Sequence, residues 1–108
     1  MKNILIHGLG QNETSWNKVK DILNNNYIDV ETPNLFNIVK NYQLNYENSY
    51  KNFTDYCNGF KEKLNLIGLS LGGILTIDYV IEYPEKVNSI ILSGTPYEIA
   101  YLRLYQMQ

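Results

Sequence analysis

Ser70 has the neighbours that a nucleophilic serine requires. It lies in Gly68-Leu69-Ser70-Leu71-Gly72, which has the pattern G-x-S-x-G. The apolar run from Leu64 to Leu69 has the length of a buried strand, and a helical pattern begins directly after Ser70. A strand, a sharp turn and a helix are the context in which this pattern forms a nucleophile elbow. The sequence therefore predicts a serine hydroxyl that could attack an acyl carbonyl.

The spacing of the glycines has a steric reason. On so tight a turn, the residues two before and two after Ser70 must lack a Cβ so that strand and helix can approach, and Gly68 and Gly72 meet this need. The turn presents the hydroxyl at a helix N-terminus, where partial positive charge favours a developing anion. A plain strand-to-helix turn with a chance serine has the same five residues, and the strand and helix around it favour the nucleophile.

A second glycine-rich loop follows another strand-like run. Asn3 to His7 is aliphatic and β-branched, as in the interior of a parallel sheet, and Gly8-Leu9-Gly10-Gln11 comes next. In parallel sheets, sites form beyond the carboxyl ends of the strands. If the first and third strands are neighbours, the loop at 8–11 and the turn at 68–73 meet there.

The elements expected along the chain alternate between strand and helix. The strands are expected at 3–7, 27–32, 64–69 and 87–92, and the helices from 14 or 15 to 24, from about 45, from 71 to 83 and from 97 to 108. This alternation predicts an α/β fold, with a parallel sheet of about four strands and helices on both faces.

Periodicity predicts which side of each helix is buried. In the first helix the apolar face consists of Trp16, Val19, Ile22 and Leu23. In the second, aromatic residues at spacings of three and four are expected to pack in the core. In the third, Asp78 and Glu82 are expected to mark the side that faces solvent.

Composition narrows the class of protein. The chain has 108 residues, enough for one domain, with 44% hydrophobic and 19% charged residues. Its net charge of -2 gives no basic excess for nucleic acid. The single Cys57 excludes an internal disulfide and a cysteine-based zinc site, and we expect neither metal nor cofactor. The apolar run Ile4 to Ile6 is too short for a signal peptide or a membrane span, so we expect a cytoplasmic protein.

These motifs resemble the α/β-hydrolase superfamily. His7-Gly8-Leu9-Gly10, followed by Trp16, is similar to the oxyanion loop of that family, and the segment 68–73 is similar to its elbow. Ser93-Gly94-Thr95-Pro96 is similar to the end of the family's next strand. The resemblance covers roughly residues 3–96. It implies a serine hydrolase acting on a small-molecule substrate, a carboxylic ester or a related acyl compound.

The resemblance also implies roles for individual residues. Ser70 would be the catalytic nucleophile, and the backbone N–H groups of Leu9 and Leu71 would form the oxyanion hole. Each such donor is typically worth about 10²–10³ in rate. The residues that would shape the two loops are His7, Gly8, Gly68 and Gly72.

The sequence departs from the family in its acid and base. In the family these residues follow the serine along the chain, but no histidine follows Ser70 here, and His7 is the single histidine. Glu98 is the best placed candidate acid. Losing the base costs about 10⁴–10⁶ in turnover, so we expect this chain alone to be nearly inert. We expect residues 1–108 to be one domain of an incomplete α/β-hydrolase fold, lacking the lid and the final strands.

Two other functions stay open at this point. A catalytically inactive hydrolase-like module could associate through the exposed sheet edge formed by the strand at 87–92, either with itself or with another protein. A nucleotide or phosphate site is the third, since a glycine-rich turn at a helix N-terminus suits anions. Neither loop has the lysine of a P-loop or the G-x-G-x-x-G spacing, so a phosphate site is the least favoured of the three functions.

Overall fold

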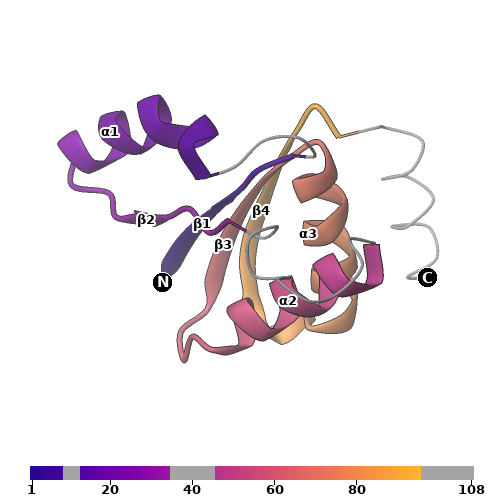
Figure 1. Ribbon diagram of the computed structural model, residues 1–108. Coiled ribbons are helices and arrows are strands. Elements are labelled where there is room, and N and C mark those ends of the chain that lie inside the picture. The colour runs from indigo at the N-terminus through magenta and orange to yellow at the C-terminus, as the bar shows by residue number, and fades with distance from the viewer. Residues whose placement is uncertain (9–12, 35–45, 96–108) are drawn as a thin grey trace.

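The computed structural model describes residues 1–8, 13–34 and 46–95 (Figure 1). Within these residues the strands form one parallel sheet in the order β2-β1-β3-β4. The strands are β1 (Lys2–Ile6), β2 (Val30–Glu31), β3 (Leu64–Leu69) and β4 (Val87–Ser93). The helices are α1 (Asn17–Asn25), α2 (Tyr46–Asn58) and α3 (Leu71–Glu82), with 3-10 turns at Glu13–Trp16 and Pro84–Lys86. The predicted α/β class is confirmed, and the helix expected at 97–108 lies outside the described residues.

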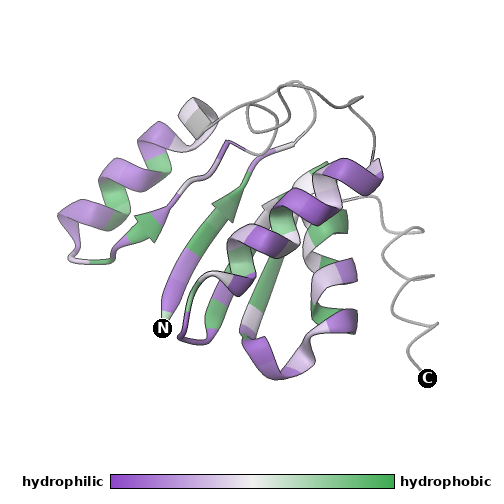
Figure 2. Cartoon of the chain, turned by 60° about the horizontal axis from the view of Figure 1, so that its bottom comes forward, coloured by the Kyte–Doolittle hydropathy of each residue, from purple (hydrophilic) through white to green (hydrophobic). Residues whose placement is uncertain are grey.

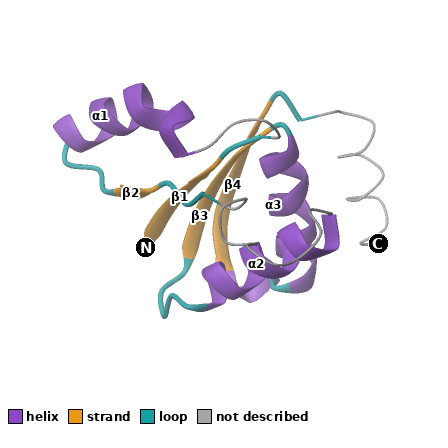
Figure 3. Ribbon diagram, in the orientation of Figure 1, coloured by secondary structure: helices purple, strands orange, loops and turns teal. Residues whose placement is uncertain are grey.

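Helices cover both faces of the sheet, as predicted. Helix α1 lies on one side of the strands, and α2 and α3 lie on the other (Figures 1 and 3). The face under α2 and α3 holds the larger core, which consists of Ile4, Ile6, Phe53, Cys57, Leu64, Leu66, Leu75 and Tyr79. The face under α1 holds Leu5, Trp16 and Val30. Because both faces of the sheet are covered, the consecutive residues Ile4, Leu5 and Ile6 are all buried.

The distribution of hydropathy follows these layers. The strand that begins at the N-terminus is hydrophilic at its start and hydrophobic along the rest of its length (Figure 2). Its register with β3 runs from Lys2 opposite Leu64 to Ile6 opposite Gly68. Strand β3 in turn pairs Leu69 with Ser93 of β4. The loops after β1, β3 and β4 therefore leave the sheet at the same edge.

The aromatic stripe of α2 packs in the core, as its spacing predicted. Phe53 and Cys57 are fully buried, and Tyr46 and Tyr50 pack beside them. The rings of Phe53 and Tyr79 meet edge to face with centroids 5.6 Å apart, which fixes α2 against α3.

The predicted apolar face of the first helix is wrong for two residues. Trp16 is buried, but it belongs to the 3-10 turn before α1, and Leu23 is half-buried. Val19 is 40% exposed and Ile22 is 62% exposed. The reason is that the sheet edge next to α1 is the two-residue strand β2, which offers little surface for a helix to cover.

The second strand is also shorter than predicted. Tyr27, expected at its start, has φ 63° and is 98% exposed, so it belongs to the turn that ends α1.

The solvent-facing side predicted for α3 is wrong for Asp78, which is half-buried because Tyr46 of α2 donates to its carboxylate. Tyr50 of α2 likewise donates to Glu82 Oε2 at 2.9 Å.

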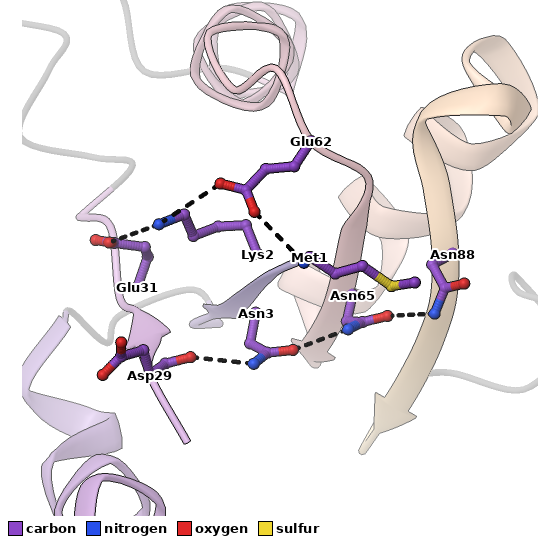
Figure 4. Close-up of polar contacts among 8 residues, drawn as sticks. All are labelled: Met1, Lys2, Asn3, Asp29, Glu31, Glu62, Asn65 and Asn88. Atoms are coloured by element: carbon purple, nitrogen blue, oxygen red, sulfur yellow. Dashed lines mark hydrogen bonds and ion pairs between the residues drawn. The ribbon is translucent and has the colours of Figure 1, made fainter. Parts of the chain in front are cut away.

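A row of polar side chains ties the strands together at the opposite edge, near their amino ends (Figure 4). Asn65 Nδ2 donates to Asn3 Oδ1 at 2.9 Å, and Asn88 Nδ2 donates to Asn65 Oδ1 at 2.8 Å. Lys2 Nζ lies 3.9 Å from carboxylate oxygens of both Glu31 and Glu62. At this edge side chains link neighbouring strands, whereas at the carboxyl edge β3 turns directly into α3 at Ser70.

No helix in the described ranges combines the length and the apolar character needed to cross a membrane.

Candidate active site

Ser70 occupies a strained turn between β3 and α3. Its backbone has φ 56° and ψ −116°, and among the described non-glycine residues only Tyr27 shares a positive φ. A serine rarely adopts this region, and such strain persists only where the surroundings impose it. The Ser70 N–H donates to Ser93 O at 2.9 Å, and the residue is exposed. The turn therefore presents its side chain outward at the carboxyl edge of the sheet.

Missing Cβ atoms allow this turn to form. A Cβ at Gly68 would lie 2.6 Å from Gly72 O, and a Cβ at Gly72 would lie 2.4 Å from Ile6 O and 2.8 Å from His7 O. Each distance is far inside van der Waals contact. Glycine at 68 lets β3 fold back on α3, and glycine at 72 brings the start of α3 against the end of β1.

The N-terminus of α3 places the partial positive charge of its backbone N–H groups beside Ser70. The Ser70 carbonyl accepts the N–H of Gly73 at 2.9 Å and, more weakly, that of Ile74 at 3.4 Å. The Leu71 N–H is the first of the helix, and such a group has no acceptor within its own helix. The Ser70 side chain makes no capping hydrogen bond. An anion developing at Ser70 would thus face the helix N-terminus.

His7 is fully buried directly after β1. Its Nδ1 lies 3.0 Å from Gly8 O, and because a carbonyl oxygen can only accept, this nitrogen is the donor. The ring is thereby fixed against its own loop, which fits the loop-shaping role that the resemblance implies.

Two predicted site residues, Leu9 as the second oxyanion donor and Glu98 as the candidate acid, lie outside the described residues. One neighbour was missed by the sequence reasoning: Thr95 Oγ1 lies 3.5 Å from Ser70 O. The signal was the segment Ser93-Gly94-Thr95 after β4, whose Gly94 has φ 60° and turns the chain toward the elbow.

Other chemistry is sparse in the described part of the chain. No group of three or more His, Cys, Asp or Glu residues there could hold a metal ion. The Cys57 thiol is fully buried in the core, and burial raises its pKa to about 12, so it is a poor nucleophile near neutral pH. Ser70 is thus the nucleophile candidate that this region presents to solvent.

Comparison with curated proteins finds esterase similarity, although no family model matches the chain. Over 96 residues the chain is 38% identical to a pimeloyl-acyl-carrier-protein methyl ester esterase of Wigglesworthia glossinidia brevipalpis. That alignment covers 86% of this chain and 36% of the esterase. The chain therefore spans about a third of the length of this relative.

Solved structures give the same fold. An extracellular α/β-hydrolase from a Paenibacillus species matches with a TM-score of 0.74 at 24% identity, over 85% of this chain and 39% of that one. A pyrethroid hydrolase from Sphingobium faniae matches with a TM-score of 0.69 at 23% identity, over 85% and 38%. At these identities the likeness concerns the fold alone. The predicted resemblance to the α/β-hydrolase superfamily is confirmed at the level of the fold.

Proposed function

Because this chain has the fold of the α/β-hydrolase superfamily, we propose that it provides the nucleophile of a serine hydrolase for carboxylic esters or related acyl bonds. The observation that carries the proposal is the strained, exposed Ser70 at the N-terminus of α3. The similarity to a methyl ester esterase supports the choice of ester substrates. A small-molecule substrate, a cytoplasmic location and no role for nucleic acid are parts of the same proposal.

The reaction would begin with attack of Ser70 Oγ on the acyl carbonyl carbon. The carbonyl oxygen would become an oxyanion that accepts hydrogen bonds from the Leu71 N–H and, in our proposal, from the Leu9 N–H. The C–O bond to the alcohol would then break, leaving the acyl group on Ser70, and water would release it as a carboxylic acid. Two protons move in this scheme: the proton of the serine hydroxyl ends on the departing alcohol, and one proton of the attacking water returns to Ser70 Oγ.

The proton transfers limit what these 108 residues can do. A serine hydroxyl without a base is a weak nucleophile near neutral pH, and no histidine follows Ser70. His7 Nδ1 is already hydrogen-bonded to Gly8 O. We propose that Ser70 has no general base among these 108 residues and that Glu98 is the candidate acid. Substrate positioning and the oxyanion donors alone would leave a rate enhancement of about 10³–10⁴ over the reaction in water.

Labelling with a fluorophosphonate tests this proposal. We expect slow modification of the 108-residue chain that maps to Ser70, disappears in Ser70→Ala and is accelerated when imidazole is supplied as an external base. The matched control is Ser93→Ala, which removes another exposed hydroxyl near the same edge and should leave the adduct unchanged. Slow labelling spread evenly over the serines would contradict a nucleophilic Ser70, and rapid stoichiometric labelling would contradict the missing base.

A second function is favoured by the position of β4. This strand ends the sheet order, and within the described residues no strand pairs with its outer side. Ile91, on β4, is 60% exposed. An unpaired, partly apolar edge is a template for pairing with another chain. If the chain is an inactive module that self-associates through β4, its mass in solution will be that of a tight dimer, and Ile91→Lys will give a monomer.

A further inference from the structure

The turn that ends β4 lies against the backbone of Ser70. The Ser70 N–H donates to Ser93 O at 2.9 Å, and Thr95 Oγ1 lies 3.5 Å from Ser70 O. Both polar groups of the Ser70 backbone are therefore contacted by one short segment of the neighbouring strand end. The catalytic scheme proposed above does not use Thr95.

Thr95 also fills a notch in α3. A Cβ built on Gly73 would lie 1.8 Å from Thr95 Oγ1, 2.9 Å from its Cβ and 3.1 Å from its Cγ2. The threonine side chain thus occupies the space that a side chain at 73 would need. Gly94, with φ 60°, makes the reversal that carries Thr95 onto this notch. The contact is steric first, and the hydrogen bond to Ser70 O is long.

We infer that Thr95 is a positioning residue that holds the Ser70 turn against the first turn of α3. This inference rests on the proposed role of Ser70. Two consecutive glycines, Gly72 and Gly73, leave the start of α3 free to adopt other backbone conformations. A strained φ at Ser70 persists only if its surroundings over-determine it. Thr95 supplies that constraint from the turn after β4, so Ser70 keeps its place at the start of α3.

A thiol at position 70 tests this inference without any base or ester. In Ser70→Cys, the rate of alkylation by iodoacetamide, followed against pH, reports the pKa of the thiol at the helix N-terminus. We expect Thr95→Ala to move the midpoint of this profile to higher pH and to slow alkylation at pH 7 by about two- to fivefold, the size of a helix-terminus effect. Thr95→Ser keeps Oγ and should restore most of the parent profile.

Three controls make the outcome decisive. The chain without Ser70→Cys carries only the buried Cys57 and gives the background. Ser89→Ala removes a β4 hydroxyl that donates to Asn65 Oδ1 at the far end of the strand, and should not shift the profile. Gly73→Ala should shift it as Thr95→Ala does, because the new Cβ would displace the Thr95 side chain from the notch. If Thr95→Ala lowers stability but leaves the pH midpoint unchanged, Thr95 is only structural and the inference fails. Because alkylation needs no hydrolysis, this result is independent of the fluorophosphonate test.

Discussion

At the scale of single residues, the site depends on two glycines, Gly68 and Gly72, that have no Cβ atom. Ser70 can adopt its positive φ because Gly68 and Gly72 let three backbone segments approach more closely than a Cβ allows. These contacts involve backbone atoms, which cannot rotate away as a side-chain end can. The glycines are therefore requirements of the turn, and a substitution at either should be costly.

Gly72→Ala should lower the free energy of unfolding by about 3 kcal/mol, since the new Cβ would meet Ile6 O and His7 O in a packed core. Gly59→Ala is the matched control. Its Cβ would lie 3.3 Å from Tyr56 O, so it should cost less than about 1 kcal/mol. Urea denaturation of both variants measures the difference. Equal losses would show that the close approach of α3 and β1 is not needed.

Tyr56 predicts how stability changes at high pH. Burial, and then the charge of Glu31, raise its pKa from 10.0 to about 12. The unfolded chain thus releases this proton at a lower pH than the folded one, so stability is lost as pH rises from about 10 toward 12. Tyr56→Phe should flatten this loss in urea melts without abolishing it, because Cys57, whose pKa is also about 12, remains. A loss equally steep in Tyr56→Phe would contradict the assignment.

At the scale of elements, α1 is the least embedded helix. None of its residues is buried, and it is joined to β2 by a turn in which Tyr27 N–H donates to Asn24 O at 3.1 Å and Ile28 N–H donates to Leu23 O at 2.8 Å. Such a helix end usually carries glycine, because its residue has a left-handed backbone. Here a tyrosine bears that conformation.

Tyr27→Gly should therefore stabilise the protein by about 1 kcal/mol. The ring is 98% exposed, so little packing is lost with it. Asn24→Gly, inside the same helix, should instead destabilise by a few tenths of a kcal/mol, roughly the difference in helix propensity. The melting temperatures of the two variants should shift in opposite directions. A lower melting temperature for Tyr27→Gly would show that the ring makes contacts in the folded protein.

Sequence reasoning predicted well the elements whose apolar pattern matches the surface that they bury. The run at 64–69 lies inside the sheet and the aromatic stripe of α2 packs on one face of it, and both were confirmed. The errors lie where tertiary context decides. Val19 and Ile22 have helical spacing but stand beside a two-residue strand, and Asp78 is polar but faces Tyr46. Periodicity shows which residues share a face, but not what lies opposite that face.

At the scale of the whole molecule, the two edges of the sheet differ in character. Asparagines and ion pairs hold the amino edge (Figure 4), whereas the carboxyl edge gathers His7, Ser70 and Thr95 from three neighbouring strand ends. The neighbouring position of the first and third strands was a condition of the sequence argument, and the register of β1 with β3 meets it. Glu98 and Leu9 stay predictions, since local pattern cannot place residues that depend on long-range packing.

Acylation by p-nitrophenyl acetate tests the central claim most directly. If Ser70 is a nucleophile at the N-terminus of α3 and lacks its base, it should be acetylated slowly, and the acetyl group should persist because water is not activated to remove it. Peptide mapping by mass spectrometry should then find the ester on Ser70 ahead of every other serine, and Ser70→Ala should lose it. An unmodified Ser70, in a chain acetylated only on other serines and on lysines, would contradict the account.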